Sequence, residues 1–149
     1  MIFYKEHLIH RNVYERKMDK SLFIPEVLGW KTENEYKEFF DSRLSKELRI
    51  LVLSIASVIR LYEKDKELII TEVYRTLEER HRLYPEGHRL HNVVGAHELW
   101  KAIDLRVWNL DPDTVEGVLR YYETSEFDFF LIYHKIRKGV NHFHIQMRS

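Results

Sequence analysis

The stretch Ala102-Ile103-Asp104-Leu105-Arg106-Val107 determines how this chain can fold, because apolar and polar side chains alternate along it. In a β-strand, successive side chains point to opposite faces of the sheet. The larger apolar members therefore share one face, which suits a core, while Asp104 and Arg106 lie on the other. The alternation predicts a half-buried strand that carries a carboxylate on its polar face.

The C-terminal segment repeats this pattern. Val140 to Met147 is predicted to be a strand in which His142 and His144 share one face, while the apolar residues between them share the opposite face. Phe127 to His134 is rich in β-branched and aromatic residues and predicts another strand. Because residues 135–139 are turn-like, the last two strands should form a hairpin.

An amphipathic helix is predicted in the first half of the chain. Thr32 and Glu35 have the spacing of a capping box, which marks a helix start. Apolar residues then follow at three- and four-residue steps, so we expect one continuous helix that buries this stripe. The stripe comprises Tyr36, Phe40, Leu44, Leu48, Leu51, Ile55, Val58 and Tyr62.

The remaining elements are shorter. Leu68 to Tyr74 has the composition of a strand. A second capping box predicts a short helix after Arg75, residues 85–96 contain proline and glycine and predict a loop, and a helix should run from Pro112 to about Glu123. Residues 1–31 form a polar-aromatic lead-in with weak periodicity. The second capping box is Thr76 with Glu79, and the N-cap before Pro112 is Asp111.

Strands that lie near each other in sequence, with helices set apart, predict an α+β domain with a small, largely antiparallel sheet and helices packed against it. The length of 149 residues suits one domain spanning residues 1–149. Lys and Arg number 24 and Asp and Glu number 24, so no net charge attracts nucleic acid. There is no cysteine, which excludes thiolate metal sites and cysteine nucleophiles.

No segment resembles a signal peptide, and the most apolar run, Ile50 to Ile59, is too short to span a bilayer. We therefore expect a protein that is cytoplasmic as synthesised, with no membrane insertion.

Histidine and aspartate at a particular spacing are the strongest chemical signal. His97 and Asp104 are separated by six residues, and His142 and His144 can point from a neighbouring strand to the same side of the sheet. Two imidazoles and one carboxylate can hold Zn²⁺ and leave a fourth position open for water, as catalytic zinc sites do. The alternative is a set of ordinary polar residues on a solvated sheet face, or a metal-free domain.

Six further histidines lack such a context, and we interpret them as surface or loop residues. His91 is the first substitute ligand if His97 does not serve. The six are His7, His10, His81, His88, His91 and His134.

Arg75 ends a strand and precedes a helix cap, so its guanidinium could project over the end of the sheet. There it could pair with a carboxylate or stabilise a developing oxyanion. A surface arginine paired with Glu78 or Glu79 is an equally good interpretation of these residues.

Three motifs together resemble the zinc D-Ala-D-Ala carboxypeptidases and their relatives, which include the VanX and VanY peptidases, phage L-alanyl-D-glutamate endolysins and the hedgehog domain. The family pattern runs Ser-Gly-Tyr-Arg, then Ser-x-His-x-x-Gly-x-Ala-x-Asp, then an acid three residues before a final His. The resemblance covers residues 68–147, the motif-bearing core. The motifs are residues 71–76, residues 95–105 and residues 141–146.

This resemblance implies a hedgehog/DD-peptidase-like fold and a zinc peptidase acting on D-amino-acid-containing peptidoglycan peptides or the D-Ala-D-Ala dipeptide. It implies that His97, Asp104 and His144 bind zinc and that Arg75 binds the substrate carbonyl. The zinc would polarise that carbonyl and lower the pKa of its water to about 7. Phage-encoded enzymes of this kind would reach the cell wall after release by a holin.

The chain departs from the family pattern at several positions. Glu72 and Val73 replace Ser-Gly, Gly95 replaces the motif serine, and Trp100 replaces the motif glycine. Asn141 stands at the position of the catalytic acid, and an amide cannot take a proton from water at neutral pH.

Two interpretations follow from Asn141. Either His142 is the catalytic base, since an imidazole titrates near neutral pH, or the domain binds zinc and a partner with little or no hydrolysis. Glu72 and Glu98 are weaker substitutes for the acid, because each could be a solvated surface charge.

Overall fold

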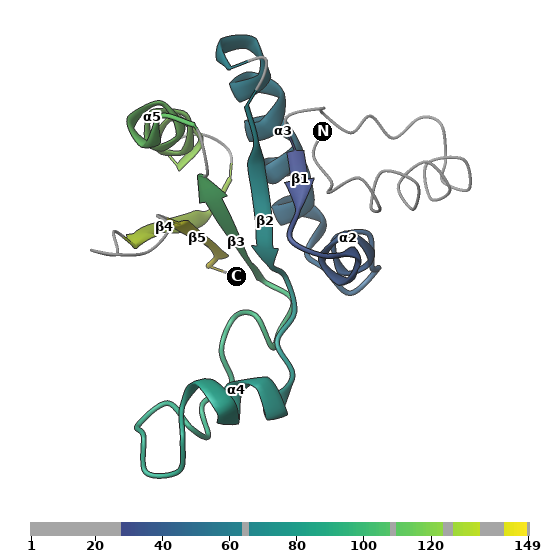
Figure 1. Ribbon diagram of the computed structural model, residues 1–149, viewed down its shortest axis with the longest axis vertical. Helices are drawn as coiled ribbons and strands as arrows, with labels where there is room; N and C mark the ends of the chain where they lie inside the picture. Colours follow the sequence, from purple (N-terminus) through teal and green to yellow (C-terminus); the bar gives the residue numbers. More distant parts are fainter. Residues whose placement is uncertain (1–27, 64–65, 108–109, 124–126, 135–141, 149) are drawn as a thin grey trace.

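The computed structural model describes residues 28–63, 66–107, 110–123, 127–134 and 142–148, and it has an α+β fold (Figure 1). The described residues form a small mixed sheet of five strands and four helices. The strands are β1 (Leu28–Trp30), β2 (Leu68–Glu72), β3 (Ala102–Val107), β4 (Phe129–His134) and β5 (His142–Met147). The helices are α2 (Glu33–Phe39), α3 (Lys46–Tyr62), α4 (Leu77–Leu83) and α5 (Pro112–Glu123).

The strands are ordered β1-β2-β3-β5-β4 across the sheet. β1 runs parallel to β2, and the other three pairings are antiparallel, so the prediction of a largely antiparallel sheet is confirmed. β3 and β5 lie side by side, with Asp104 opposite His144 and Leu105 opposite Phe143. This register gives the pair one apolar face and one face with potential metal ligands.

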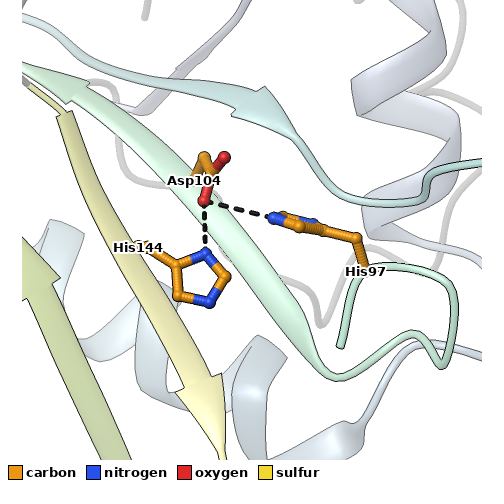
Figure 2. Close-up of side chains that lie close together, drawn as sticks. All are labelled: His97, Asp104 and His144. Carbon is orange, nitrogen blue, oxygen red and sulfur yellow. Dashed lines mark hydrogen bonds and ion pairs between the residues drawn. The ribbon is translucent and has the colours of Figure 1, made fainter. Parts of the chain in front are cut away.

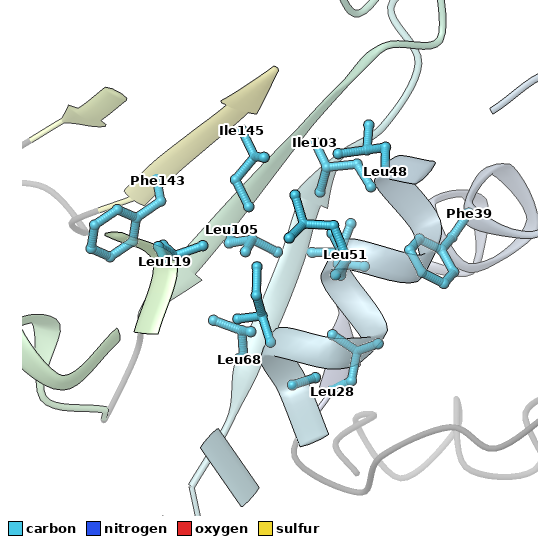
Figure 3. Packing of buried hydrophobic residues seen from close by; sticks show 14 of the residues in the cluster. Leu28, Phe39, Leu48, Leu51, Leu68, Ile103, Leu105, Leu119, Phe143 and Ile145 are labelled. Atoms are coloured by element: carbon cyan, nitrogen blue, oxygen red, sulfur yellow. The ribbon is translucent and has the colours of Figure 1, made fainter. Parts of the chain in front are cut away.

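Helices α3 and α5 cover the apolar face (Figure 3). One buried cluster contains Leu48 and Leu51 of α3, Ile103 of β3, Leu119 of α5 and Phe143 of β5. All five side chains are fully buried. Because one face carries the core, a slip of one residue in β3 would expose its apolar side chains, which fixes the register that the polar face depends on.

The prediction of one continuous helix from Thr32 is wrong. The chain forms α2 and α3 instead, with a break between Phe40 and Ser45, which caps α3 by accepting a hydrogen bond from the backbone N–H of Leu48. The apolar period runs through the break because Leu44 is buried there as well. The predicted stripe is buried at most of its positions, but Tyr62 at its end is 69% exposed. The pattern also cannot distinguish a helix from a buried turn.

The lead-in predicted for residues 1–31 contains a strand that its weak periodicity did not reveal. β1 is three residues long and lies at the edge of the sheet, beside β2. Trp30 anchors it, since its buried ring packs edge-on against Tyr36 at 5.0 Å. Residues 1–27 lie outside the described residues.

The other predicted elements are confirmed with small changes at their ends. Both capping boxes are present, at Thr32 and at Thr76, and α5 begins at Pro112. β2 ends at Glu72 and β4 begins at Phe129, while the predicted turn at 135–139 lies outside the described residues. Among the helices described, none is both long and apolar enough to cross a membrane.

Candidate metal centre

His97, Asp104 and His144 converge on the polar face of the sheet (Figure 2). Asp104 and His144 are cross-strand partners on β3 and β5, and His97 comes from the segment that leads into β3. Asp104 Oδ1 lies 3.2 Å from His97 Nε2 and 2.8 Å from His144 Nδ1. One atom from each residue lies within 4.8 Å of the others, so the group could hold a metal ion.

The second nitrogen of each imidazole has an acceptor of its own. His97 Nδ1 lies 3.0 Å from the carbonyl oxygen of Val73, and His144 Nε2 lies 3.0 Å from Gln146 Oε1. In a neutral imidazole, an N–H that donates to such an acceptor leaves the lone pair on the other nitrogen, where a metal ion could bind. Metal-binding histidines are held in this way, and the outer partner fixes both the ring orientation and the tautomer. A hydrogen bond to Asp104 instead requires a proton on the nitrogen that faces it.

His97 and Asp104 each shift the pKa of the other. Burial alone would lower the pKa of His97, but its hydrogen bond to Asp104 and the charge of that carboxylate raise it above the usual histidine value. Burial would also raise the pKa of Asp104, yet hydrogen bonds from His144 and His97 hold it well below the usual range. A permanent carboxylate thus faces two imidazoles that either a proton or a cation can bridge.

The donor set fits a divalent metal ion. Two ligand atoms on a tetrahedral zinc ion are about 3.3 Å apart, because each lies about 2.0–2.1 Å from the metal. The separations of 3.2 Å and 2.8 Å from Asp104 Oδ1 to the two nitrogens are therefore close to those of a bound site. Imidazole nitrogens with one carboxylate suit several transition metals, so geometry alone does not select zinc.

A buried ion pair holds the segment that carries His97. Arg80 of α4 is 5% exposed and donates hydrogen bonds from Nε and Nη2 to both carboxylate oxygens of Glu98. Glu98 Oε2 also accepts the backbone N–H of Gly95, and Arg80 Nη1 donates to the carbonyl of Leu90. The interpretation of Glu98 as a solvated surface charge is therefore wrong, because its carboxylate is largely shielded from water and paired with Arg80 of α4.

Gly95 is required by this ion pair. A Cβ atom at that position would collide with Arg80 Nη2 and Glu98 Oε2. The backbone can approach the two charged groups closely only because residue 95 has no side chain.

Trp100 adopts a backbone conformation that normally favours glycine. Its φ is 59°, in the left-handed region that side chains with a Cβ rarely occupy. Packing offsets the strain, since its ring stacks on Tyr74 at 4.4 Å and the Arg43 guanidinium lies 4.5 Å above it. The turn that it closes connects His97 to β3, through a hydrogen bond from the Trp100 N–H to the His97 carbonyl.

Arg75 lies beside the metal ligands and is largely buried. Its Nε and Nη2 donate to the two carboxylate oxygens of Glu72 at 2.6 Å and 2.8 Å. Burial alone would lower the pKa of Arg75, but the hydrogen bond and charge of Glu72 raise it. The prediction of a carboxylate partner is thus correct, whereas pairing with Glu78 or Glu79 as a surface arginine is wrong.

Glu72 is not a solvated surface charge either. It forms the ion pair with Arg75, and its Oε2 lies 4.0 Å from His97 Nε2. An open cleft of about 430 Å³ beside the metal ligands is lined by Glu72, Arg75, Asp104 and His142, together with other residues. His142 therefore lines the same cleft as Asp104, and Asn141 lies outside the described residues.

The other histidines take no part in this group. His81 and His91 stack on each other at 4.0 Å, and His91 Nδ1 lies 2.6 Å from the carbonyl of Tyr84. His88 is exposed and His91 lies in the loop, as predicted, while His81 is half-buried within α4. His97, and not His91, belongs to the group that could hold a metal ion. His7, His10 and the side chain of His134 lie outside the described part of the chain.

Several supporting residues escaped the sequence analysis. Gln146 could have been found, because it follows His144 by two residues on the same strand face. The Val73 carbonyl and the ion pair between Arg80 and Glu98 leave no local signal, since both partners come from distant segments.

No protein-family model, curated protein or solved structure matches this chain.

Proposed function

We propose that this chain is a zinc-dependent peptidase that cleaves D-amino-acid-containing peptides of peptidoglycan, with a hedgehog/DD-peptidase-like fold. The observation that carries the proposal is the convergence of His97, Asp104 and His144 on one face of the sheet. Three protein ligands leave a fourth position for water or substrate, which is typical of catalytic zinc sites, whereas structural sites are usually closed by four.

Two features of the fold support the resemblance to the zinc D-Ala-D-Ala carboxypeptidases. The three motifs, far apart in sequence, meet at one cleft, which Arg75, Asp104 and His142 line. Trp100, at the position of the family glycine, has a φ of 59°, where a glycine would be free of strain. The turn that brings His97 to Asp104 therefore has a backbone shape that favours glycine, although this chain has tryptophan at that position.

Zinc would be held by His97 Nε2, Asp104 Oδ1 and His144 Nδ1, with Val73 and Gln146 as the outer partners. When bound, zinc polarises a carbonyl group and makes water a stronger nucleophile at neutral pH. Arg75 would bind the substrate carbonyl oxygen and stabilise the charge that develops there. Glu72 holds the guanidinium in place for this role.

His142 is the first candidate for the catalytic base. It precedes His144 by two residues on the same face of β5 and lines the cleft. An imidazole that titrates near neutral pH can accept a proton from water and return it to the leaving amine.

Metal analysis combined with a peptide assay tests the proposal. The purified protein, loaded with zinc, is incubated with muropeptides and with D-Ala-D-Ala, and the release of D-Ala or cleavage between L-Ala and D-Glu is followed by mass spectrometry. We expect one zinc per chain and hydrolysis, both lost in His144→Ala. Stoichiometric zinc with no product at any pH would refute the peptidase, and absence of bound metal would refute the site.

A zinc-binding module without hydrolysis is the second candidate, and Asn141 favours it. The substitution Asn141→Asp supplies the missing acid. If the wild type is inactive and this variant hydrolyses muropeptides, the module is the better description. If His142→Ala abolishes an activity that the wild type has, the module is excluded.

A further inference from the structure

Glu72 belongs to the same cross-strand row as two of the metal ligands. Its Cα pairs with Asp104 of β3, and Asp104 pairs with His144 of β5. Adjacent strands are about 4.8 Å apart, so side chains in one row on one face are close neighbours. His142 stands in the next row, opposite Arg106, two residues and about 7 Å further along the strand.

A β-bulge brings Glu72 into this row. Ile70 pairs with Leu105, yet Glu72 pairs with Asp104, so β2 has one extra residue, Thr71, at this point. Without the bulge, Glu72 would oppose Ile103 and point into the core. Bulges redirect side chains in this way and are over-represented beside active sites. The Thr71 hydroxyl stabilises the irregular step by donating to the Asp104 carbonyl at 3.3 Å.

The Glu72 carboxylate is held close to the ligands but retains capacity to accept more hydrogen bonds. Arg75 donates one hydrogen bond to each oxygen, while an ionised carboxylate offers about four acceptor sites. Its Oε2 lies 4.0 Å from His97 Nε2, the nitrogen that faces Asp104. The side chain is 26% exposed, and it lines two clefts. Water can therefore reach it.

From this placement we infer that Glu72, rather than His142, is the catalytic base of the centre, and that its carboxylate binds and deprotonates the attacking water. The inference rests on the proposed hydrolase function and names a residue for it on β2, away from the position of Asn141. In the reaction, one O–H bond of water breaks and its proton moves to Glu72 as the oxygen adds to the peptide carbonyl carbon. The proton then passes to the amide nitrogen as the C–N bond breaks, which gives one carboxylic acid and one amine.

The substitution Glu72→Gln tests the inference while preserving the shape of the side chain. We expect the variant to fold and bind one zinc per chain, because none of the three ligands is altered. Its kcat should fall by about 100-fold or more, the usual contribution of general acid–base catalysis, with KM nearly unchanged. Hydrolysis of p-nitrophenyl acetate is measured beside the peptide assay, since it reports on activated water whatever the peptide specificity.

Glu38→Gln is the matched control. Glu38 lines the neighbouring cleft together with Glu72 but lies on α2, outside the row of ligands. We expect both hydrolytic rates of this variant to equal those of the wild type. A Glu72→Gln variant that is as active as the wild type, or that no longer binds zinc, would overturn the inference.

A purely positional role for Glu72, through Arg75, predicts a different result. In that case Glu72→Gln, Arg75→Gln and the double variant should be equally slow, because all three remove one function. If Glu72 reacts itself, the double variant should be slower than either single variant.

The ester assay keeps this inference separable from the peptidase. A wild type that hydrolyses the ester but no muropeptide refutes the proposed substrate and leaves the Glu72→Gln comparison decisive. A zinc-loaded wild type that hydrolyses neither compound refutes both.

Discussion

The candidate metal centre has two walls that are built in different ways. On the strand wall, Asp104 and His144 are cross-strand partners, fixed by the hydrogen-bond ladder between β3 and β5. On the loop wall, His97 lies outside any helix or strand and depends on single contacts, such as the carbonyl of Val73 and the ion pair between Arg80 and Glu98. Figure 1 shows the contrast, since α4 and its loop extend away from the sheet.

The difference teaches where the centre is vulnerable. Many backbone hydrogen bonds hold β3 and β5 together, so no single side chain on either strand determines the strand positions. The loop wall depends on individual contacts, among them those of the buried Arg80 guanidinium and of Trp100, whose backbone is strained. Substitutions on the loop wall should therefore disturb metal binding even though they touch no ligand, and substitutions on the strand wall should act locally.

Removing one partner of the buried ion pair should have the largest effect. Arg80→Met leaves the Glu98 carboxylate without its cationic partner, which typically costs about 3–5 kcal/mol for a buried ion pair. We expect the free energy of unfolding to fall by that order and zinc affinity to fall with it, as measured by urea denaturation and by titration with zinc. The control Arg82→Met, an exposed arginine on the same helix, should change neither.

The double variant Arg80→Met/Glu98→Met provides a second check. Because no charge remains unpaired, it should be more stable than Arg80→Met alone. If the double variant is the less stable of the two, the ion pair is not what holds this wall.

Substitution of Trp100 should have the next largest effect. Comparing two variants distinguishes the contribution of packing from that of backbone strain. Trp100→Ala removes the stack on Tyr74 and keeps a Cβ in the left-handed region, and large-to-small changes of a buried aromatic cost about 3–5 kcal/mol. Trp100→Gly loses the same packing but relieves the strain, by about 1 kcal/mol. We expect the glycine variant to be the more stable by that difference in chemical denaturation. Equal stabilities would show that φ at this position carries no strain.

The strand wall was predictable from sequence, and much of the loop wall was not. Alternation along residues 102–107 and 142–147 is a local signal, so it identified the faces of both strands together with Asp104 and His144. The six-residue spacing placed His97 near them. Glu72 and Glu98 resembled solvated charges, and Arg80 was not singled out, because their structural roles depend on a bulge or on a partner in another segment. Neither feature leaves a periodic pattern in the sequence.

The errors in the first half of the chain have a related cause. Burial continues through the turn between α2 and α3, so the apolar period did not break where the helix did. β1 is three residues long, too short for an alternation to be visible, and it is stabilised by pairing with β2. In both places tertiary contacts decide the local conformation.

On the strand wall, Gln146 should show a smaller and more specific effect. Gln146→Leu removes the acceptor for His144 Nε2, and loss of such an outer partner typically lowers metal affinity by about 10- to 100-fold. We expect this loss in a zinc titration, with little change in the urea midpoint. Gln146→Glu keeps an acceptor oxygen and should restore most of the affinity. A large loss of stability in Gln146→Leu would contradict a local role.

The change of stability with pH should be the smallest effect. As the pH rises through neutrality, the metal-free protein should lose stability, whereas the stabilisation by zinc should increase. Because the folded pKa of His97 is raised, its contribution to the stability of the metal-free protein is fully present below the ordinary histidine pKa of about 6.5, and it is lost as the pH rises through the raised value. The pKa of Asp104 is lowered, so its contribution is present above about 3.9 and is lost as the pH falls toward the folded value.

Metal-free protein should therefore be most stable between these limits, whereas zinc needs neutral imidazoles and binds better as the pH rises. We expect the rise in Tm on adding zinc to be small at about pH 5.5 and several times larger at about pH 8. In His97→Gln, which cannot take up the proton, the alkaline loss of stability of the metal-free protein should disappear. If zinc raises Tm equally at both pH values, the ligands do not exchange a proton for the metal. Asp104 would then not couple the protonation of His97 on the loop wall to that of the strand wall.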